Sequence, residues 1–167
     1  MQSAMYNQQV PVSAPPYARP DVVERIGRLV AVTGAHAVIL LDAQENNLSG
    51  QPGKGPEIGT LLKVDTPKSI SLAMISALSS PMPSHSRDEK ELRIVEVEFI
   101  GELPKDERGL PKSFRRGISC YPSLGDVVYR ASKAELEKAY ACDAETAIRV
   151  GHITQDSTIP AMIKIDE

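Results

Sequence analysis

The stretch Val95-Glu96-Val97-Glu98-Phe99 decides the fold class of this chain of 167 residues. Apolar and acidic side chains alternate along it, so the apolar side chains share one face of a β-strand and the glutamates share the other. An antiparallel sheet that is buried on one side and wet on the other has this pattern. We therefore expect an antiparallel sheet in which the two glutamates face solvent.

Segments with the same period of two lie on both sides of this strand. Residues 26–32 and 37–41 predict a hairpin, in which Gly34 would take the first central position of a two-residue type II′ turn. Further strands are predicted over residues 60–65, 70–78, 115–119, 127–130, 146–150 and 161–165. One face of the 70–78 strand is expected to carry Ile70, Leu72, Met74 and Leu78.

The sequence Ser132-Lys133-Ala134-Glu135 is a capping box, in which Ser132 satisfies amides of the first helical turn and Glu135 reaches back. It predicts a short helix that ends near Ala141. Short strands at this spacing, with a single helix, favour an all-β fold. The fold class that we expect is a small closed β-barrel of about six strands with peripheral strands and one short α-helix.

The domain organisation follows from composition. Residues 1–21 hold four prolines among glutamine, serine and alanine, and they predict a disordered, proline-rich N-terminal arm. Residues 22–167 are expected to form one barrel domain. A polar loop over residues 43–56 is expected to be mobile, and a second loop is predicted over residues 79–90. The start of the chain does not resemble a signal peptide, and no apolar run approaches the ~20 residues of a membrane span, so we expect a cytoplasmic protein.

Composition also argues against several classes of site. The formal net charge is −3, and 4% of the residues are aromatic with no tryptophan. Binding of nucleic acid needs a basic surface that neutralises phosphates, and single-strand binding also needs aromatic side chains for base stacking. The two cysteines, Cys120 and Cys142, match no metal-ligand spacing and are too few for a disulfide framework.

The candidate catalytic and ligand sites fail on their residue patterns. Residues 50–55 superficially resemble a phosphate-binding loop, but Leu48 stands where that loop needs glycine and Gly55 where it needs Ser or Thr, so we interpret them as a flexible linker. Three histidines lack a second ligand at metal-binding spacing and are interpreted as surface residues: His36, His85 and His152. No Ser or Cys has a base positioned by the sequence. The sequence therefore predicts no catalytic group, no cofactor and no metal site in this chain.

One segment is electrostatically distinct. Between residues 105 and 116, five basic and two acidic side chains give a local charge of +3. The basic side chains are Lys105, Arg108, Lys112, Arg115 and Arg116. The segment is either a solvated loop or a basic rim that faces DNA or an acidic partner.

Five stretches of the chain form a pattern when they are taken together. They are Ile26-Gly27-Arg28-Leu29-Val30, Ile58-Gly59-Thr60-Leu61-Leu62-Lys63-Val64, Gly101-Glu102-Leu103, Phe114-Arg115-Arg116-Gly117-Ile118-Ser119 and Tyr121-Pro122-Ser123-Leu124-Gly125-Asp126-Val127-Val128-Tyr129. In order and spacing they resemble the N-terminal barrel of HerA-like ATPases, which shares its architecture with the barrel of ATP synthase catalytic subunits. The resemblance covers residues 25–166, which is nearly everything except the arm.

This resemblance implies a six-stranded β-barrel at the head of a hexameric, ring-shaped, ATP-driven DNA translocase. In that family the barrels help to hold the ring together and dock a partner, such as a nuclease in DNA end processing or another effector in anti-phage defence. It therefore implies a non-catalytic assembly and docking module, with copies of itself and a nuclease or effector as partners. Direct binding of nucleic acid is expected to be weak or absent, and no membrane contact is expected. ATP and Mg²⁺ would bind the ATPase core, whose motifs are absent here, so we expect this chain to be a fragment of a longer protein.

The resemblance carries over nine residues as family-motif and possible interface positions: Gly101, Glu102, Arg115, Arg116, Gly117, Tyr121, Pro122, Gly125 and Asp126. Both Gly117 and Gly125 are expected at turns or bulges. Tyr121 either anchors a contact or caps the barrel core. Glu102 is expected to make a hydrogen bond or salt bridge near its strand end. Replacing Arg115 and Arg116 jointly by glutamate is expected to weaken contacts with copies or partners without unfolding the barrel.

A second hypothesis is a free-standing OB-like barrel that binds nucleic acid or another ligand. The acidic balance, and the lack of a strand face that is both aromatic and basic, disfavour it. An affinity for an oligonucleotide that depends on salt and stays tight at moderate salt would favour it over the assembly module.

Overall fold

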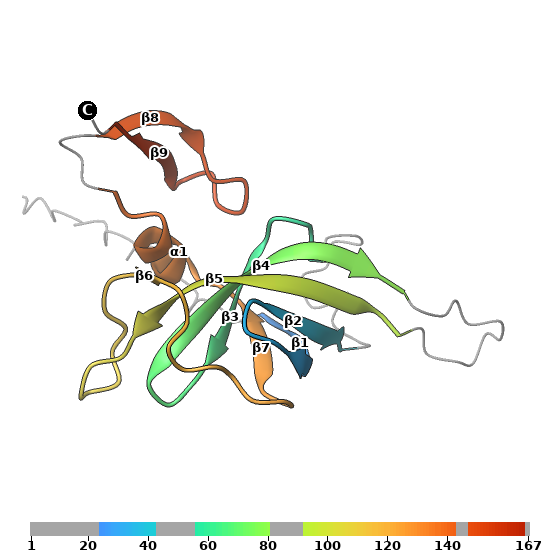
Figure 1. Ribbon diagram of the computed structural model, residues 1–167. Helices are drawn as coiled ribbons and strands as arrows, with labels where there is room; N and C mark the ends of the chain where they lie inside the picture. Colours follow the sequence, from blue (N-terminus) through green and yellow to red (C-terminus); the bar gives the residue numbers. More distant parts are fainter. Residues whose placement is uncertain (1–23, 43–55, 81–91, 143–146, 166–167) are drawn as a thin grey trace, which may run out of the picture.

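A computed structural model describes residues 24–42, 56–80, 92–142 and 147–165 (Figure 1). Its elements in chain order are β1 (Arg25–Val32), β2 (His36–Leu41), β3 (Leu61–Asp65), β4 (Ser69–Ser79), β5 (Ile94–Pro104), β6 (Arg115–Arg116), β7 (Val127–Arg130), α1 (Lys133–Ala139), β8 (Ala147–His152) and β9 (Pro160–Lys164). The predicted arm at 1–21, the linker at 50–55 and His85 lie outside the described residues.

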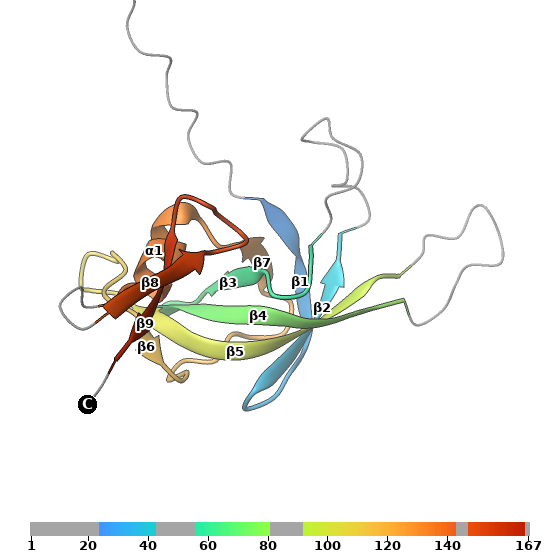
Figure 2. The ribbon, with the colours of Figure 1, turned by 90° about the horizontal axis from the view of Figure 1, so that it is seen from above.

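Six strands close into an antiparallel barrel in the order β1-β7-β3-β4-β5-β2, because β2 pairs with both β5 and β1. β6 pairs with β5 at Gly101 and Glu102, beyond Glu98, where the pairing of β5 with β2 stops. β8 and β9 form a separate hairpin (Figures 1 and 2). The predicted fold class, a small closed β-barrel with peripheral strands and one short helix, is confirmed.

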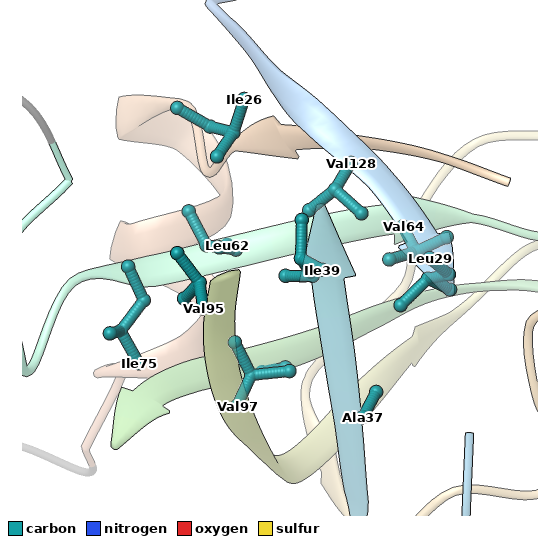
Figure 3. Close-up of a cluster of buried hydrophobic side chains, with 11 residues drawn as sticks. Ile26, Leu29, Ala37, Ile39, Leu62, Val64, Ile75, Val95, Val97 and Val128 are labelled. Carbon is teal, nitrogen blue, oxygen red and sulfur yellow. The ribbon is translucent and has the colours of Figure 1, made fainter. Parts of the chain in front are cut away.

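The barrel interior is filled by side chains from all six strands, which point toward one another in Figure 3. The cluster consists of Ile26, Leu29, Ala37, Ile39, Leu62, Val64, Ala73, Ile75, Val95, Val97 and Val128. Phe99 packs against it, whereas Glu96 and Glu98 are exposed on the outer side of β5. The predicted alternation of buried apolar and exposed acidic side chains along β5 is therefore confirmed.

A second apolar cluster lies on the outside of the barrel, where α1 and residues 153–159 cover β3 and β4. It contains Leu61, Ile70, Leu72, Leu103, Ala131, Leu136 and Ile159. β4 is thus buried on both faces, as its middle strand position and its helix cover require.

The predicted shared face on β4 is correct for three residues and wrong for the fourth. Ile70, Leu72 and Met74 lie together beneath α1. A bulge between Ile75 and Ala77 then reverses the alternation, so Leu78 pairs with Val95 on the interior side and ends 44% exposed.

Two other local predictions need correction. Gly34 does not have a positive φ, so the β1–β2 turn is not type II′; instead the Thr33 hydroxyl accepts from the His36 amide and donates to the His36 carbonyl. The strand predicted over residues 115–119 ends at Arg116, because Gly117 has a φ of +82° and turns the chain away.

The β8–β9 hairpin is attached to the barrel through the residues of its turn. The Gln155 amide oxygen accepts from the Leu61 amide at 2.7 Å, and the Gln155 amide nitrogen donates to the Leu61 carbonyl at 3.1 Å. Along the strands, the cross-strand pair Ile148 and Ile163 remains 55% exposed on each side chain. The sequence contained no signal for the Gln155 contact, because its partner is 94 residues away.

Candidate functional site

The motif residues meet where β6 lies against β5. Gly101 pairs with Arg116, and Glu102 pairs with Arg115. A side chain at position 101 would overlap the Arg115 carbonyl oxygen and the ring of Phe114, which packs into the outer apolar cluster. Glycine at this position therefore allows the β6 backbone to approach β5 closely.

Glu102 is the centre of this region and is fully buried. It pairs with Ser71, which lies on the barrel-interior side of β4, so its carboxylate closes one end of the barrel. The carboxylate accepts hydrogen bonds from the Arg115 guanidinium, from the Ser119 hydroxyl at 2.6 Å and from the Ser119 amide at 3.1 Å. The expected hydrogen bond and salt bridge are both present, and they fasten residues 115–119 to the barrel.

These contacts determine the ionisation of Glu102. Burial by itself would raise the pKa of this carboxyl, but hydrogen bonds from Ser119, Arg115 and Ser69 outweigh it and lower the pKa to about 2. The group is therefore a carboxylate at neutral pH, and we assign it a structural role as an ionic latch. We use "Glu102 latch" below for Glu102, Arg115 and Ser119.

The structure separates the two arginines that the sequence treated together. Arg115 is bound in the Glu102 latch and also donates to the Ser119 hydroxyl at 3.1 Å. Arg116 is exposed, and its guanidinium makes no hydrogen bond or ion pair within the described part of the chain. Glutamate at position 115 would place a second carboxylate beside a buried one, so the joint replacement is expected to destabilise this end of the barrel, contrary to the expectation from sequence.

Residues 117–126, which include Ser119 of the latch, lead from β6 to β7 across the barrel end. Tyr121 donates a hydrogen bond from its hydroxyl to the Gly34 carbonyl at 2.7 Å. Its ring meets Phe99 edge to face, with ring centroids 6.0 Å apart. Of the two roles considered for Tyr121, these contacts support capping of the barrel core. Pro122 beside it is buried.

Replacing Tyr121 with phenylalanine is expected to lower the free energy of unfolding by about 1 kcal/mol, because the ring contact remains and one hydrogen bond is lost. Urea unfolding followed by circular dichroism measures the change. Tyr129→Phe is the matched control, since no hydrogen bond of the Tyr129 hydroxyl occurs among the described residues, and it should change the value by less than about 0.5 kcal/mol. Equal effects of both replacements would contradict the capping role.

The last motif residues join this segment to β1. Gly125 has a φ of +89°, which confirms its predicted place in a turn. The Asp126 carboxylate accepts from the Ser123 amide at 2.8 Å, while the backbones of Gly125 and Asp126 bond to Leu29 at 2.8 Å and 3.0 Å. Asp126 therefore holds the turn in place.

The basic segment forms an ordered turn rather than a row of equivalent cations. The Lys105 ammonium binds the Asp65 carboxylate and donates to the Thr66 carbonyl at 2.7 Å. Asp106 accepts at one carboxylate oxygen from the amides of Arg108 and Leu110, at 2.9 Å and 2.8 Å. Gly109 completes the turn with a φ of +79°. Arg108 and Lys112 remain exposed on it, and the Leu110 side chain is 60% exposed.

A buried ion pair next to this region had only a partial signal in the sequence. The Glu135 carboxylate accepts from the Ser132 amide, as the capping box predicted, and it also accepts from the Ser132 hydroxyl. It also binds the Lys63 ammonium of β3 at 2.6 Å, which joins α1 to the barrel. The capping-box pattern predicts the contact between Glu135 and Ser132, which are three residues apart. It gives no information on the contact between Glu135 and Lys63.

The described residues also bear on the metal, thiol, histidine and membrane expectations from sequence. The described residues contain no group of three or more His, Cys, Asp or Glu side chains placed to hold a metal ion. Cys120 and Cys142 are half-buried thiols. His36 and His152 are exposed, as the sequence predicted. In the ranges that the structure describes, no helix has the length and apolar character needed to cross a bilayer. Comparison of the sequence with models of protein families and with curated proteins finds no match.

Proposed function

We propose that this chain is a non-catalytic assembly and partner-docking barrel of a HerA-like, ATP-driven DNA translocase. It supports a hexameric ring and docks a nuclease or other effector in DNA end processing or anti-phage defence, in the cytoplasm. One observation carries the proposal: the residues of the motif converge on one end of a closed barrel, where the Glu102 latch fastens residues 115–119 and Asp126 holds the turn before β7.

The contacts of the motif residues support a structural role for them. Four motif residues make side-chain hydrogen bonds within this chain: Glu102, Arg115, Tyr121 and Asp126. The fifth charged or polar one, Arg116, makes none among the described residues. The six strands of the closed barrel pair with one another, and free sheet edges remain at β6 and in the β8–β9 hairpin. We therefore propose that the barrel contacts other proteins through its faces and turns. We accordingly propose that ATP and Mg²⁺ act in the motor of the parent protein and that this chain needs no cofactor.

The solution mass of the 167-residue chain tests the assembly role. Light scattering over a concentration series is expected to show a mass that rises toward a hexamer, because ring contacts in the barrel would then be populated by mass action. A strict monomer at all concentrations would contradict assembly through the barrel.

The second candidate, an OB-like binder, is favoured by the exposed cations Arg108, Lys112 and Arg116 at one barrel end. The same concentration series in the presence of a labelled single-stranded oligonucleotide separates the two candidates. Tight binding at moderate salt by a monomeric chain would support the OB-like binder.

A further inference from the structure

The outer face of β5 near its start is acidic, and no other element among the described residues covers it. Glu96 pairs with Val38 of β2 and Ala77 of β4, and Glu98 pairs with His36 of β2. We call these residues, together with Leu40 and Ile94 in the adjoining row, the acidic sheet face. Val38, Ala77, Leu40 and Ile94 are half-buried, whereas both glutamates are exposed.

The carboxylates of this face have no partner in the part of the chain that the structure describes. Neither Glu96 nor Glu98 makes a side-chain hydrogen bond or ion pair there. Arg28 of β1, which pairs with Leu40, is a cation at the margin of the face. The acidic sheet face thus offers two unpaired carboxylates beside half-buried apolar side chains.

A surface of opposite charge is present on the same chain. The turn after β5, residues 105–112, exposes Arg108 and Lys112 on either side of Leu110. Arg116 and Lys68 are also exposed, and Lys68 lies beside the turn because its carbonyl accepts from the Lys105 amide at 2.9 Å. We call this surface the basic turn. None of its four exposed cations makes a side-chain hydrogen bond or ion pair among the described residues.

The basic turn is held in one conformation by its own contacts. Asp106 accepts from two backbone amides within it, and the Lys138 ammonium of α1 donates to the Pro111 carbonyl. A pre-ordered loop loses less conformational entropy when it binds a partner. An exposed leucine between two cations on such a loop suits a partner surface that is both apolar and acidic.

The two surfaces lie at opposite ends of β5, as the positions of β2 and of the turn beyond β5 show in Figures 1 and 2. One molecule therefore cannot satisfy both surfaces by itself. Two different complementary patches on one subunit produce head-to-tail contacts, which close into a ring when the rotation between subunits permits it.

We propose that the basic turn of one chain docks on the acidic sheet face of a second copy, with Leu110 against the apolar side chains beside Glu96 and Glu98. This inference rests on the proposed assembly function and identifies the two surfaces that perform it. The contact is charge-dependent, so it weakens as salt concentration rises.

Charge reversal on each surface tests the pairing. The chain with Arg108→Glu and Lys112→Glu, and separately the chain with Glu96→Lys and Glu98→Lys, are each expected to self-associate at least about tenfold more weakly than wild type in sedimentation velocity. The control matched to the second variant, Glu57→Lys with Glu137→Lys, makes the same change in net charge as Glu96→Lys with Glu98→Lys, at exposed positions outside both surfaces, and should associate like wild type. Circular dichroism confirms that every variant is folded.

Mixing the two variants gives the sharper result. The first variant retains its acidic sheet face and the second retains its basic turn, and the reversed turn of the first is also complementary to the reversed face of the second. A mixture is therefore expected to associate again, with the two variants alternating, although each variant alone associates weakly. A chain with all four reversals is expected to associate again, because both charges are exchanged. Wild type is expected to grow beyond a dimer.

The failures of the two proposals are distinguishable. Wild-type association that is unaffected by both reversals would overturn this pairing and leave the assembly role intact; the exposed pair Ile148 and Ile163 would then be the next surface to test. Loss of association in both variants without recovery in the mixture would also overturn the head-to-tail pairing. A wild-type chain that stays monomeric would overturn both the pairing and the assembly role.

Discussion

Replacing Gly27 with alanine is expected to lower the free energy of unfolding by about 3 kcal/mol. Gly27 lies in β1, and an added Cβ would overlap the Leu40 carbonyl oxygen and lie 3.0 Å from the Leu40 carbonyl carbon. The obstacle is backbone, which cannot change rotamer. Leu40 pairs with Arg28 on one side and with Ile94 on the other, so β2 cannot move away without loss of strand pairing.

Gly34 provides the matched control for this replacement. It has no positive φ, and a Cβ there would meet nothing within 4 Å. Gly34→Ala should leave stability unchanged or raise it by up to about 1 kcal/mol, because alanine restricts the unfolded chain. Urea unfolding of the two variants measures the difference. A Gly27→Ala chain as stable as wild type would mean that β1 and β2 do not approach each other in this register.

The second large effect is expected in the free energy of unfolding at acidic pH, to which the Glu102 latch contributes. The pKa of Glu102 is lowered from 4.5 to about 2 in the folded state. Between these values the unfolded chain binds a proton that the folded chain does not, so stability rises with pH in this window. The latch contribution is complete above pH 4.5 and is lost as the pH falls toward 2, and it amounts to roughly 3 kcal/mol.

Glu102→Gln separates this contribution from other acidic groups. Glutamine keeps the size of the side chain but does not titrate, so the variant is expected to be about 2–3 kcal/mol less stable at neutral pH. The difference from wild type should shrink as the pH falls from 4.5 toward 2. Hydrogen bonds from Thr158 also lower the pKa of Asp156. Protonation of Asp156 in acid therefore destabilises wild type and Glu102→Gln alike, and it does not change the difference between them.

Urea unfolding at a series of pH values measures this effect. Glu96→Gln is the control, because it removes one exposed carboxylate that lies outside the latch. A stability difference between wild type and Glu102→Gln that stays constant with pH would contradict a charged, hydrogen-bonded Glu102.

The candidate site was only partly predictable. Sequence reasoning identified Gly117 and Gly125 as turn or bulge positions and expected a hydrogen bond or salt bridge at Glu102, but it named Gly101 only as a motif position. It could not distinguish Arg115, which closes the latch, from its neighbour Arg116, which does not. The two arginines are adjacent in sequence, but side chains alternate along a strand, so only the pairing of β6 with β5 decides which one meets the buried carboxylate.

The sequence by itself determined the fold class and the alternating environment of β5, because a period of two in hydrophobicity reports the two faces of a strand directly. The capping box likewise predicted the start of α1, since its two residues lie within one helical turn. Each of these features depends on neighbours a few positions apart.

Only the tertiary structure decided how the barrel closes and which groups meet. The β2–β5 pairing, the cover of α1 over β4 and the Glu102 latch all join segments that are distant along the chain. It also placed the acidic sheet face and the basic turn at opposite ends of β5. The physical reason is that the hydrophobic pattern along the chain indicates only whether a side chain is buried. The hydrogen-bond partners of strand edges and of buried charges come from distant segments, and only the closed barrel brings those segments together.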